Sequence, residues 1–265
     1  MQAYDSASCA TKGARDYQED SSAFWPPKDG SSGSPDVPTA NHTRLVAVLA
    51  DGMGGHTGGA LASGMVCENF ISAYSCLNGA RPERLLKALR MANTAIADKV
   101  MANPVLSGMG STIVAAVFAN DGVEWVSVGD SPLLLFRRGE LALLNEDHSL
   151  APELDRMVAA GRMTAEEARH DPRRHMLRSA VTGEELDLVD VSRRPLTLEA
   201  GDYVILASDG LHTLEASEIQ RIVAAYANDG AEAVASALIR AVEAIRDPHQ
   251  DNTTVMAVRP LPEQA

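Results

Sequence analysis

The sequence has few of the residues that build disulfide frameworks, zinc sites or membrane spans. Its three cysteines, Cys9, Cys67 and Cys76, are odd in number and lack C-x-x-C spacing, so neither a disulfide framework nor a zinc knuckle is indicated. No apolar run approaches the ~18 residues of a membrane span, and Asp5 interrupts the N-terminus before a signal-peptide core forms. These features predict a protein of the reducing cytoplasm that does not contact membranes.

Positive charge is also scarce. Lys and Arg total 23 against 36 Asp and Glu, which gives a formal net charge of −13 at pH 7. An anionic surface repels phosphate backbones and anionic lipids, so we expect neither a nucleic-acid partner nor a membrane partner. The same balance is compatible with cation binding.

The length favours one domain, because 265 residues are many for one average domain and few for two. We therefore expect a single domain over residues 1–265. A hydrophobic content of 45% with 22% charged residues is ordinary for a globular protein and excludes collagen-like, coiled-coil and disordered chains. The segment Trp25–Thr43 is rich in Pro, Gly and Ser and is too short for an interdomain linker, so we expect a mobile surface loop there.

Short runs dense in Val, Ile and Leu indicate β-strands. The expected strands are Arg44–Ala50, Ser111–Ala119, Val123–Val128, Leu133–Phe136, Leu141–Leu144, Tyr203–Ala207 and Thr253–Val258. Asn120-Asp121-Gly122 joins two of these runs and Arg138-Gly139 joins two more. Such short connections predict antiparallel hairpins.

Longer amphipathic stretches lie between the strands and predict two pairs of helices. The pairs are Gly59–Cys76 with Pro82–Met101, and Ala216–Asn228 with Ala231–Ile245. Long helices segregated from antiparallel strands indicate an α+β layered domain. From about His148 to Gly183, a charged stretch with two short helical pieces, Pro152–Ala160 and Thr164–Arg169, interrupts the strand pattern. We expect this stretch to be an insertion over the sheet.

Acidic residues at strand ends are the candidate functional groups. Of the Asp-Gly dipeptides, those at Asp29, Asp121 and Asp229 fit ordinary turns. Asp51 and Asp209 differ, because each follows an apolar strand that holds the carboxylate on a rigid element. Rigid placement is what a metal site or a catalytic site requires.

Further acidic residues share this placement. Asp130 follows another strand, Asp251 precedes the last one, and Glu19-Asp20 comes shortly after Arg15. Taken singly, Asp130 or Asp251 fits an ordinary turn or cap. Together with Asp51 and Asp209 they make a set of acidic residues with no accompanying Cys/His ligand set, which suits Mg²⁺ or Mn²⁺ rather than zinc.

The order of these motifs resembles a known family. The motifs are Arg15…Glu19-Asp20, Asp51-Gly52-Met53-Gly54-Gly55-His56, Gly110-Ser111-Thr112, Gly129-Asp130-Ser131, Ser208-Asp209-Gly210-Leu211 and Asp251-Asn252. From about Ala10 to Val258, the chain resembles the bacterial form of the metal-dependent serine/threonine protein phosphatases of type 2C. The resemblance implies two stacked antiparallel sheets flanked by helix pairs, an α-β-β-α sandwich, with residues 148–183 as the family's variable flap beside the active site.

The resemblance also implies a role for each acidic residue. By matching position, Asp51 would bridge two Mn²⁺ or Mg²⁺ ions, the Gly52 carbonyl would bind one of them, and Asp209 and Asp251 would hold the other. Glu19 would act largely through metal-bound water. Asp20 and Asn252 would support these ligands from behind.

Two further roles follow by matching position. Asp130, with Asp209, would hold a weaker third ion, and Arg15 would bind the substrate phosphate through its planar fork. The implied mechanism is hydrolysis by a water that bridges two metals, without a covalent intermediate. The implied substrates are proteins phosphorylated on serine or threonine by a kinase. Two alternatives stay open: a phosphatase of a small phosphate ester, and a catalytically silent module that binds a phosphoprotein.

One departure from the family and one cluster of charge lead to further predictions. Animal members typically carry a histidine directly after the Asp-Gly pair, where this chain has Met53, and the nearby His56 is either a catalytic acid or a helix cap. In the flap, the four arginines Arg169, Arg173, Arg174 and Arg178 are opposed by Asp171 and make a local positive patch. The patch predicts either substrate docking or a solvated surface.

Overall fold

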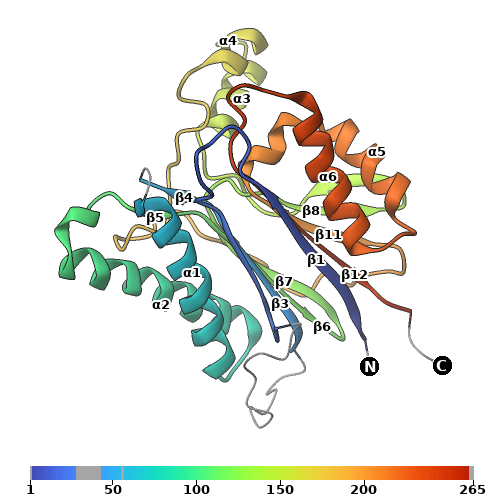
Figure 1. The fold of residues 1–265 in the computed structure, drawn as a ribbon, viewed down its shortest axis with the longest axis horizontal. Helices are drawn as coiled ribbons and strands as arrows, with labels where there is room; N and C mark the ends of the chain where they lie inside the picture. Colours follow the sequence, from blue (N-terminus) through green and yellow to red (C-terminus); the bar gives the residue numbers. More distant parts are fainter. Residues whose placement is uncertain (1, 28–42, 55–56, 263–265) are drawn as a thin grey trace.

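Two five-stranded antiparallel sheets lie face to face, and a pair of long helices covers the outer face of each (Figure 1). This computed structural model describes residues 2–27, 43–54 and 57–262. The layers follow the order expected from the sequence, helices, sheet, sheet, helices. The α+β sandwich is therefore confirmed.

One sheet, sheet A, contains both the first and the last strand of the described chain. Its order is β1 (Tyr4–Thr11), β12 (Thr253–Pro260), β11 (Tyr203–Ala207), β8 (Leu133–Arg137) and β9 (Glu140–Leu143). In the β8–β9 hairpin, Arg138 and Gly139 take φ values of 52° and 83°. Positive φ at both central residues is what a type I′ turn requires, so the predicted hairpin is confirmed.

The other sheet, sheet B, has the order β10 (Asp190–Val191), β7 (Gly122–Val128), β6 (Ile113–Ala119), β3 (Thr43–Ala50) and β2 (Ser21–Trp25). A two-stranded ladder pairs β4 (Gly52–Met53) with β5 (Gly110–Ser111). The predicted run Ser111–Ala119 is thus two strands, interrupted at Thr112. The interruption has a local cause, because the Thr112 backbone and side chain both bond the backbone of Asp51.

The helices bury their apolar faces on the outer sides of the sheets. Helices α1 (Thr57–Cys76) and α2 (Arg81–Ala102) cover sheet B, and α5 (Ala216–Tyr226) and α6 (Ala231–Ile245) cover sheet A. The predicted bounds of these four helices hold within two residues. Two 3₁₀ turns lie in the connections: η1 (Pro104–Leu106) between α2 and β5, and η2 (Asp209–Thr213) between β11 and α5.

Alternation along β3 divides its side chains between two cores. Val46 and Val48 face α1 and α2, whereas Ala47 and Leu49 face sheet A. This is the two-residue period of a strand that is buried on both sides. The apolar layer between the sheets therefore fixes the distance between their strand ends.

Three edge strands are present that the sequence pattern did not predict: β1, β2 and the two-residue β10. Strand β1 has the sequence YDSASCAT and β2 has SSAFW, so neither carries a dense run of Val, Ile or Leu. Each lies at the edge of its sheet and is only partly buried along its length. Most of the expected loop Trp25–Thr43, with Asp29, lies outside the described residues.

The insertion forms two short helices at one end of the sandwich, α3 (Ala151–Ala159) and α4 (Ala165–His170) (Figure 1). Thr164 caps α4 in a reciprocal capping box with Glu167, which explains the predicted start of that helix. No helix among the described residues is long and apolar enough to cross a membrane.

Candidate active site

Five of the six acidic residues predicted from the sequence, all but Asp20, line one pocket of about 640 Å³. Its lining includes Arg15, Glu19, Asp51, Gly52, Met53, Asp130, Asp209 and Asp251, together with flap residues such as His175 and Arg178. Asp51 follows β3, Asp130 follows β7, Asp209 follows β11, and Asp251 precedes β12. Both sheets therefore contribute carboxylates to the same end of the sandwich.

The backbone of Asp51 is held on both sides by the Gly110-Ser111-Thr112 motif. Its amide donates to Thr112 Oγ1 at 3.0 Å. Its carbonyl accepts from Ser111 Oγ at 2.8 Å and from the Thr112 amide at 2.9 Å. Thr112 Oγ1 also shares a 2.7 Å bond with Ser131 Oγ, next to Asp130. These bonds occupy the peptide groups of Asp51 and fix its backbone at the pocket.

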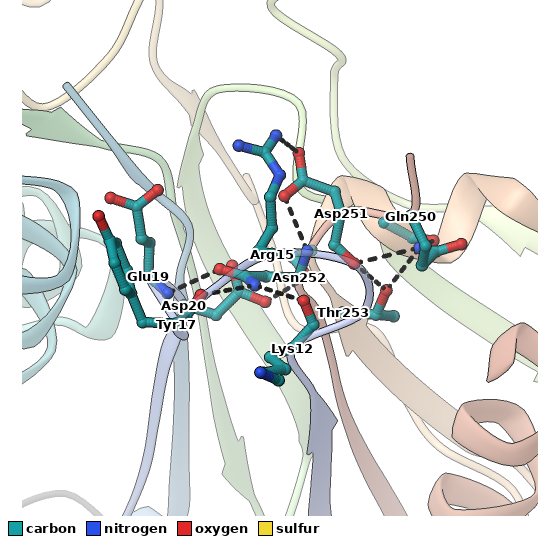
Figure 2. Close-up of polar contacts among 11 residues, drawn as sticks. Lys12, Arg15, Tyr17, Glu19, Asp20, Gln250, Asp251, Asn252 and Thr253 are labelled. Carbon is teal, nitrogen blue, oxygen red and sulfur yellow. Dashed lines mark hydrogen bonds and ion pairs between the residues drawn. The ribbon is translucent and has the colours of Figure 1, made fainter. Parts of the chain in front are cut away.

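Asn252 fastens the loop that carries Arg15 and Glu19, as Figure 2 shows. Its Nδ2 donates to the carbonyls of Lys12 at 2.9 Å and Tyr17 at 3.1 Å. Its Oδ1 accepts from the Glu19 amide at 2.7 Å. One buried amide thus binds both ends of residues 12–19.

Arg15 and Asp251 form an ion pair across the pocket (Figure 2). Arg15 Nη2 lies 2.5 Å from Asp251 Oδ2, and the two side chains are 52% and 42% exposed. The other oxygen of Asp251 accepts from the Asn252 amide at 2.7 Å. The resemblance implies separate roles for these two residues, and 236 positions separate them, so nothing in the local pattern indicates their contact.

Asp20 is buried beneath the pocket. Its Oδ2 accepts from Ser208 Oγ at 2.7 Å and from Thr254 Oγ1 at 2.8 Å, whereas its Oδ1 has no hydrogen-bond partner among the described residues. Burial raises the pKa of Asp20 to about 6, against the opposing effect of the two hydroxyl groups. The residue links the start of β2 to β11 and β12, which hold Asp209 and Asp251.

The pocket carboxylates raise one another's proton affinity. The pKa of Asp51 is well above its usual range because of burial and, next, the charges of Asp20, Asp209 and Asp130. Burial and Asp209 raise the pKa of Asp130 to about 7. The pKa of Asp209 is raised by burial and by Asp251, and a hydrogen bond between the Asp51 and Asp209 carboxyl groups opposes that rise. This crowding favours protons or cations in the pocket.

Two glycines let the backbone close tightly beside Glu19. A Cβ on Gly52 would overlap the carbonyl groups of Gly59 and Glu19. A Cβ on Gly59, in the first turn of α1, would lie 2.6 Å from Glu19 Oε1. That oxygen is buried and has no hydrogen-bond partner among the described residues. The close approach places the Gly52 backbone, the start of α1 and the Glu19 carboxylate together.

The side-chain positions do not by themselves form a closed ligand set. Within the described ranges, no three His, Cys, Asp or Glu side chains are arranged as a ready metal-binding group. One of the acidic side chains, Asp251, is instead paired with Arg15.

Two of the four flap arginines form ion pairs with aspartates, one is exposed on α4, and one lines the active-site pocket. Arg173 Nη2 lies 2.8 Å from Asp171 Oδ2, and Arg174 Nη1 lies 2.8 Å from Asp155 Oδ1. Arg169 is exposed on α4, and Arg178 lines the pocket. Asp155, which pairs with Arg174, comes from α3 and was not part of the sequence pattern. Two of the four positive charges are therefore paired, and Arg178 is the flap arginine that lies beside the acidic residues of the pocket.

Several contributing residues were not singled out from the sequence. Ser208 and Thr112 lie inside two of the motifs named above, but those motifs do not predict their contacts with Asp20 and Asp51. Thr254 and the flap residue His175 carry no local signal. Met53 lines the pocket as expected from its motif. Gly55 and His56 lie outside the described residues.

The sequence is similar to bacterial phosphatases. A sequence model of the family described as Protein phosphatase 2C matches residues 36–244. Serine/threonine protein phosphatase PstP of Mycobacterium tuberculosis is 40% identical over 173 residues, which are 63% of this chain and 32% of PstP. Protein phosphatase PhpP of Streptococcus pneumoniae is 34% identical over 186 residues, 68% of this chain and 73% of PhpP. The match spans about a third of the length of PstP and most of PhpP.

Solved structures agree over nearly the whole chain. The crystal structure of the M. tuberculosis phosphatase PstP/Ppp has a TM-score of 0.75 at 30% identity and covers 97% of this chain and 98% of that chain. The PstP catalytic domain in complex with two manganese ions has a TM-score of 0.72 at 28% identity, with coverage of 99% and 100%. By its motifs, its layered fold and these matches, the chain belongs to the protein phosphatase 2C family.

Proposed function

We propose that this chain is a metal-dependent phosphatase that hydrolyses phosphoserine and phosphothreonine in proteins. The observation that carries the proposal is the convergence of Asp51, Asp130, Asp209 and Asp251 on one pocket that also contains Arg15. PstP, named as a serine/threonine protein phosphatase, and PhpP, named as a protein phosphatase, support the same reaction. We infer that the described residues form one catalytic domain, that it acts in the cytoplasm, and that its substrates are made by a serine/threonine kinase.

The residues of the pocket fit two Mn²⁺ or Mg²⁺ ions. All the proposed donors are hard oxygen atoms, which these cations prefer. Mutual repulsion raises the proton affinity of the carboxylates, and Glu19 Oε1 is buried without a partner. Asp51 would be shared by both ions, the Gly52 carbonyl would bind one, Asp209 and Asp251 would bind the other, and Glu19 would contribute through water. The PstP catalytic domain, whose structure contains two manganese ions, supports the number and the kind of ions proposed.

When bound, such ions lower the pKa of coordinated water and neutralise charge on the phosphoryl group. The chain's own groups orient the reactants. Arg15 is half exposed and offers its planar fork to phosphate oxygens once it leaves Asp251. Asn252 and Asp20 hold the loops behind these groups in place. We assign Asp130, with Asp209, to a weaker third ion.

The reaction needs no cysteine nucleophile. None of the described residues that line the pocket is a cysteine. Burial raises the pKa of the Cys67 thiol, which keeps it protonated in the core under α1. Attack by water accords with both facts.

Turnover with and without metal tests the proposal. p-Nitrophenyl phosphate, a phosphothreonine peptide and a set of small phosphate esters are compared in Mn²⁺ and in chelator. We expect hydrolysis of the peptide only with metal. Hydrolysis of the small esters alone would favour the small-ester phosphatase, and no turnover with any divalent metal would favour a silent phosphoprotein-binding module.

A further inference from the structure

A second cavity of about 490 Å³ adjoins the active-site pocket along α2. Helix α2 contributes one wall and residues 184–189 contribute the other. The apolar lining is Leu86, Leu89, Leu186 and Val189, the acidic lining is Glu184 and Glu185, and the exposed Arg90 of α2 adds a positive charge. Leu86, Leu186 and Val189 are only partly buried against the core under α2, so this groove leaves apolar surface open to solvent.

The groove is continuous with the active-site pocket. Glu184 and Glu185 line both cavities and are exposed. A chain that leaves the active-site pocket over these two residues therefore enters the groove on α2.

The wall between the two cavities is fixed to the helix. Asn93 Oδ1 accepts from the Gly183 amide at 2.8 Å, and Asn93 Nδ2 donates to the Glu184 carbonyl at 2.7 Å. Gly183 has a φ of +88°, and a Cβ there would lie 2.6 Å from the backbone of Ala97 on α2. This contact requires glycine. Because the segment is held against α2, the groove is formed before any ligand binds, which lowers the entropic cost of binding.

The carboxylates at the end of the groove that meets the active-site pocket favour a cation there, whereas Arg90 lies on the α2 wall. Glu184 and Glu185 are exposed carboxylates, and Asp187, also exposed, lines the same side of the active-site pocket. No ion pair of the described residues involves any of the three. A basic side chain next to a phosphorylated residue would lie opposite these carboxylates, whereas an acidic one would be repelled.

We propose that this groove binds the part of the phosphoprotein substrate that flanks the phosphorylated residue. The preferred flank carries a basic side chain opposite Glu184 and Glu185 and, beyond it, an apolar side chain in the groove on α2. The inference rests on the proposed function and deepens it, because it names the chemistry of the preferred substrate sequence.

A peptide series tests the substrate side. Phosphothreonine peptides carry Arg or Glu at one scanned position and Leu or Ser at another, on either side of the phosphoresidue, and kcat/KM is measured in Mn²⁺. We expect one Arg and Leu arrangement to exceed its Glu and Ser counterpart roughly tenfold or more, since burying a leucine and removing a like charge are together worth at least one factor of ten.

A matched pair of variants tests the groove. Thr94 is exposed on α2 and lines the groove, so Thr94→Trp fills it. Met91 is 52% exposed on the same helix and is not among the lining residues, so Met91→Trp is the control. We expect Thr94→Trp to reduce the peptide preference to near unity while p-nitrophenyl phosphate turnover stays unchanged, and Met91→Trp to keep the preference.

The outcomes separate the two proposals. Equal kcat/KM across the peptide series, or a preference that survives Thr94→Trp, would overturn the groove assignment and leave the phosphatase proposal standing. A wild type that hydrolyses p-nitrophenyl phosphate but no phosphopeptide would overturn both. Dimerisation that Thr94→Trp abolishes, in a wild type without peptide preference, would assign the groove to a second copy of the chain and overturn the substrate proposal.

Discussion

At the residue scale, the pocket depends on carboxylates that are costly without a counter-charge. Burial raises the pKa of Asp51, and the charges of four other aspartates raise it further. Repulsion of this kind is tolerated where cations or protons offset it. The individual residues are therefore expected to matter for function more than for folding.

Replacing Asp51 tests this directly. Asp51→Asn keeps the shape and removes the charge, and we expect kcat to fall at least ~100-fold because both the nucleophile and the charge stabilisation depend on the metal pair. Asp229→Asn is the matched control, since Asp229 is exposed in the turn between α5 and α6. Calorimetric titration with Mn²⁺ should show weakened binding only in Asp51→Asn. Full activity of that variant would remove Asp51 from the site.

Met53 is expected to affect how kcat/KM depends on the leaving group. Its thioether lines the pocket and carries no titratable proton, so it cannot protonate a departing oxygen. We expect kcat/KM across a series of aryl phosphates to fall steeply as the leaving phenol becomes more basic, and Met53→His to flatten that slope. A shallow slope in the wild type that steepens in His56→Ala would instead identify His56 as the acid.

At the element scale, the start of α1 is set by contact with the pocket as well as by helix propensity. Gly59 and Gly64 both lie in α1, but their surroundings differ. A Cβ at Gly59 would meet Glu19 Oε1 at 2.6 Å and the Gly52 carbonyl carbon at 3.0 Å, whereas a Cβ at Gly64 would meet only Ser21 Oγ at 3.9 Å.

Two alanine substitutions should therefore have opposite effects. Gly64→Ala should stabilise the fold by roughly 0.5–1 kcal/mol, because alanine loses less backbone entropy in a helix. Gly59→Ala should destabilise it and lower kcat, because Glu19 and the Gly52 backbone must move. Urea unfolding and p-nitrophenyl phosphate turnover measure both. Equal stabilisation by the two substitutions would show that the contact at Gly59 is unimportant.

The elements also show what a sequence pattern can and cannot predict. The predicted bounds of apolar strands such as β11 and of paired helices such as α6 agree with the structure within a residue or two, because the pattern of their own apolar residues indicates their burial. Edge strands β1 and β2 were not predicted, because an edge strand that is partly exposed to solvent can form from small polar residues without a run of Val, Ile or Leu. In the site, Asp51 and Asp209 were found because each ends an apolar strand. The contacts of Arg15 with Asp251 and of Arg174 with Asp155 depend on tertiary structure and leave no local pattern.

At the scale of the whole molecule, metal and pH should act together on stability. Burial and Asp209 raise the pKa of Asp130 to about 7 in the folded, metal-free chain, against about 3.9 for an unperturbed aspartate. Between these values the folded state binds more protons than the unfolded state. The stability that this proton confers is present at low pH and is lost as pH rises from about 4 to about 7.

Melting temperatures measure this linkage. In chelator, the Tm of Asp130→Asn relative to wild type should rise as pH increases from 4 to 7.5, because asparagine never ionises. Saturating Mn²⁺ should raise the wild-type Tm, and more at pH 7.5 than at pH 5, since cations bind the deprotonated ligands and only the native state. A Tm difference between the two proteins that does not change with pH would contradict the raised pKa of Asp130.

The position of β12 has a consequence for how the protein is made. Strand β12 pairs with β1, with Tyr4 opposite Pro260, and Asp251 lies directly before it. During synthesis the ribosome releases the earlier strands long before this one. A nascent chain therefore lacks Asp251 and the strand between β1 and β11 until residues 251–260 emerge. If the chain has the proposed activity, a ribosome-bound chain that has not yet released these residues is expected to be inert towards the phosphoproteins around it.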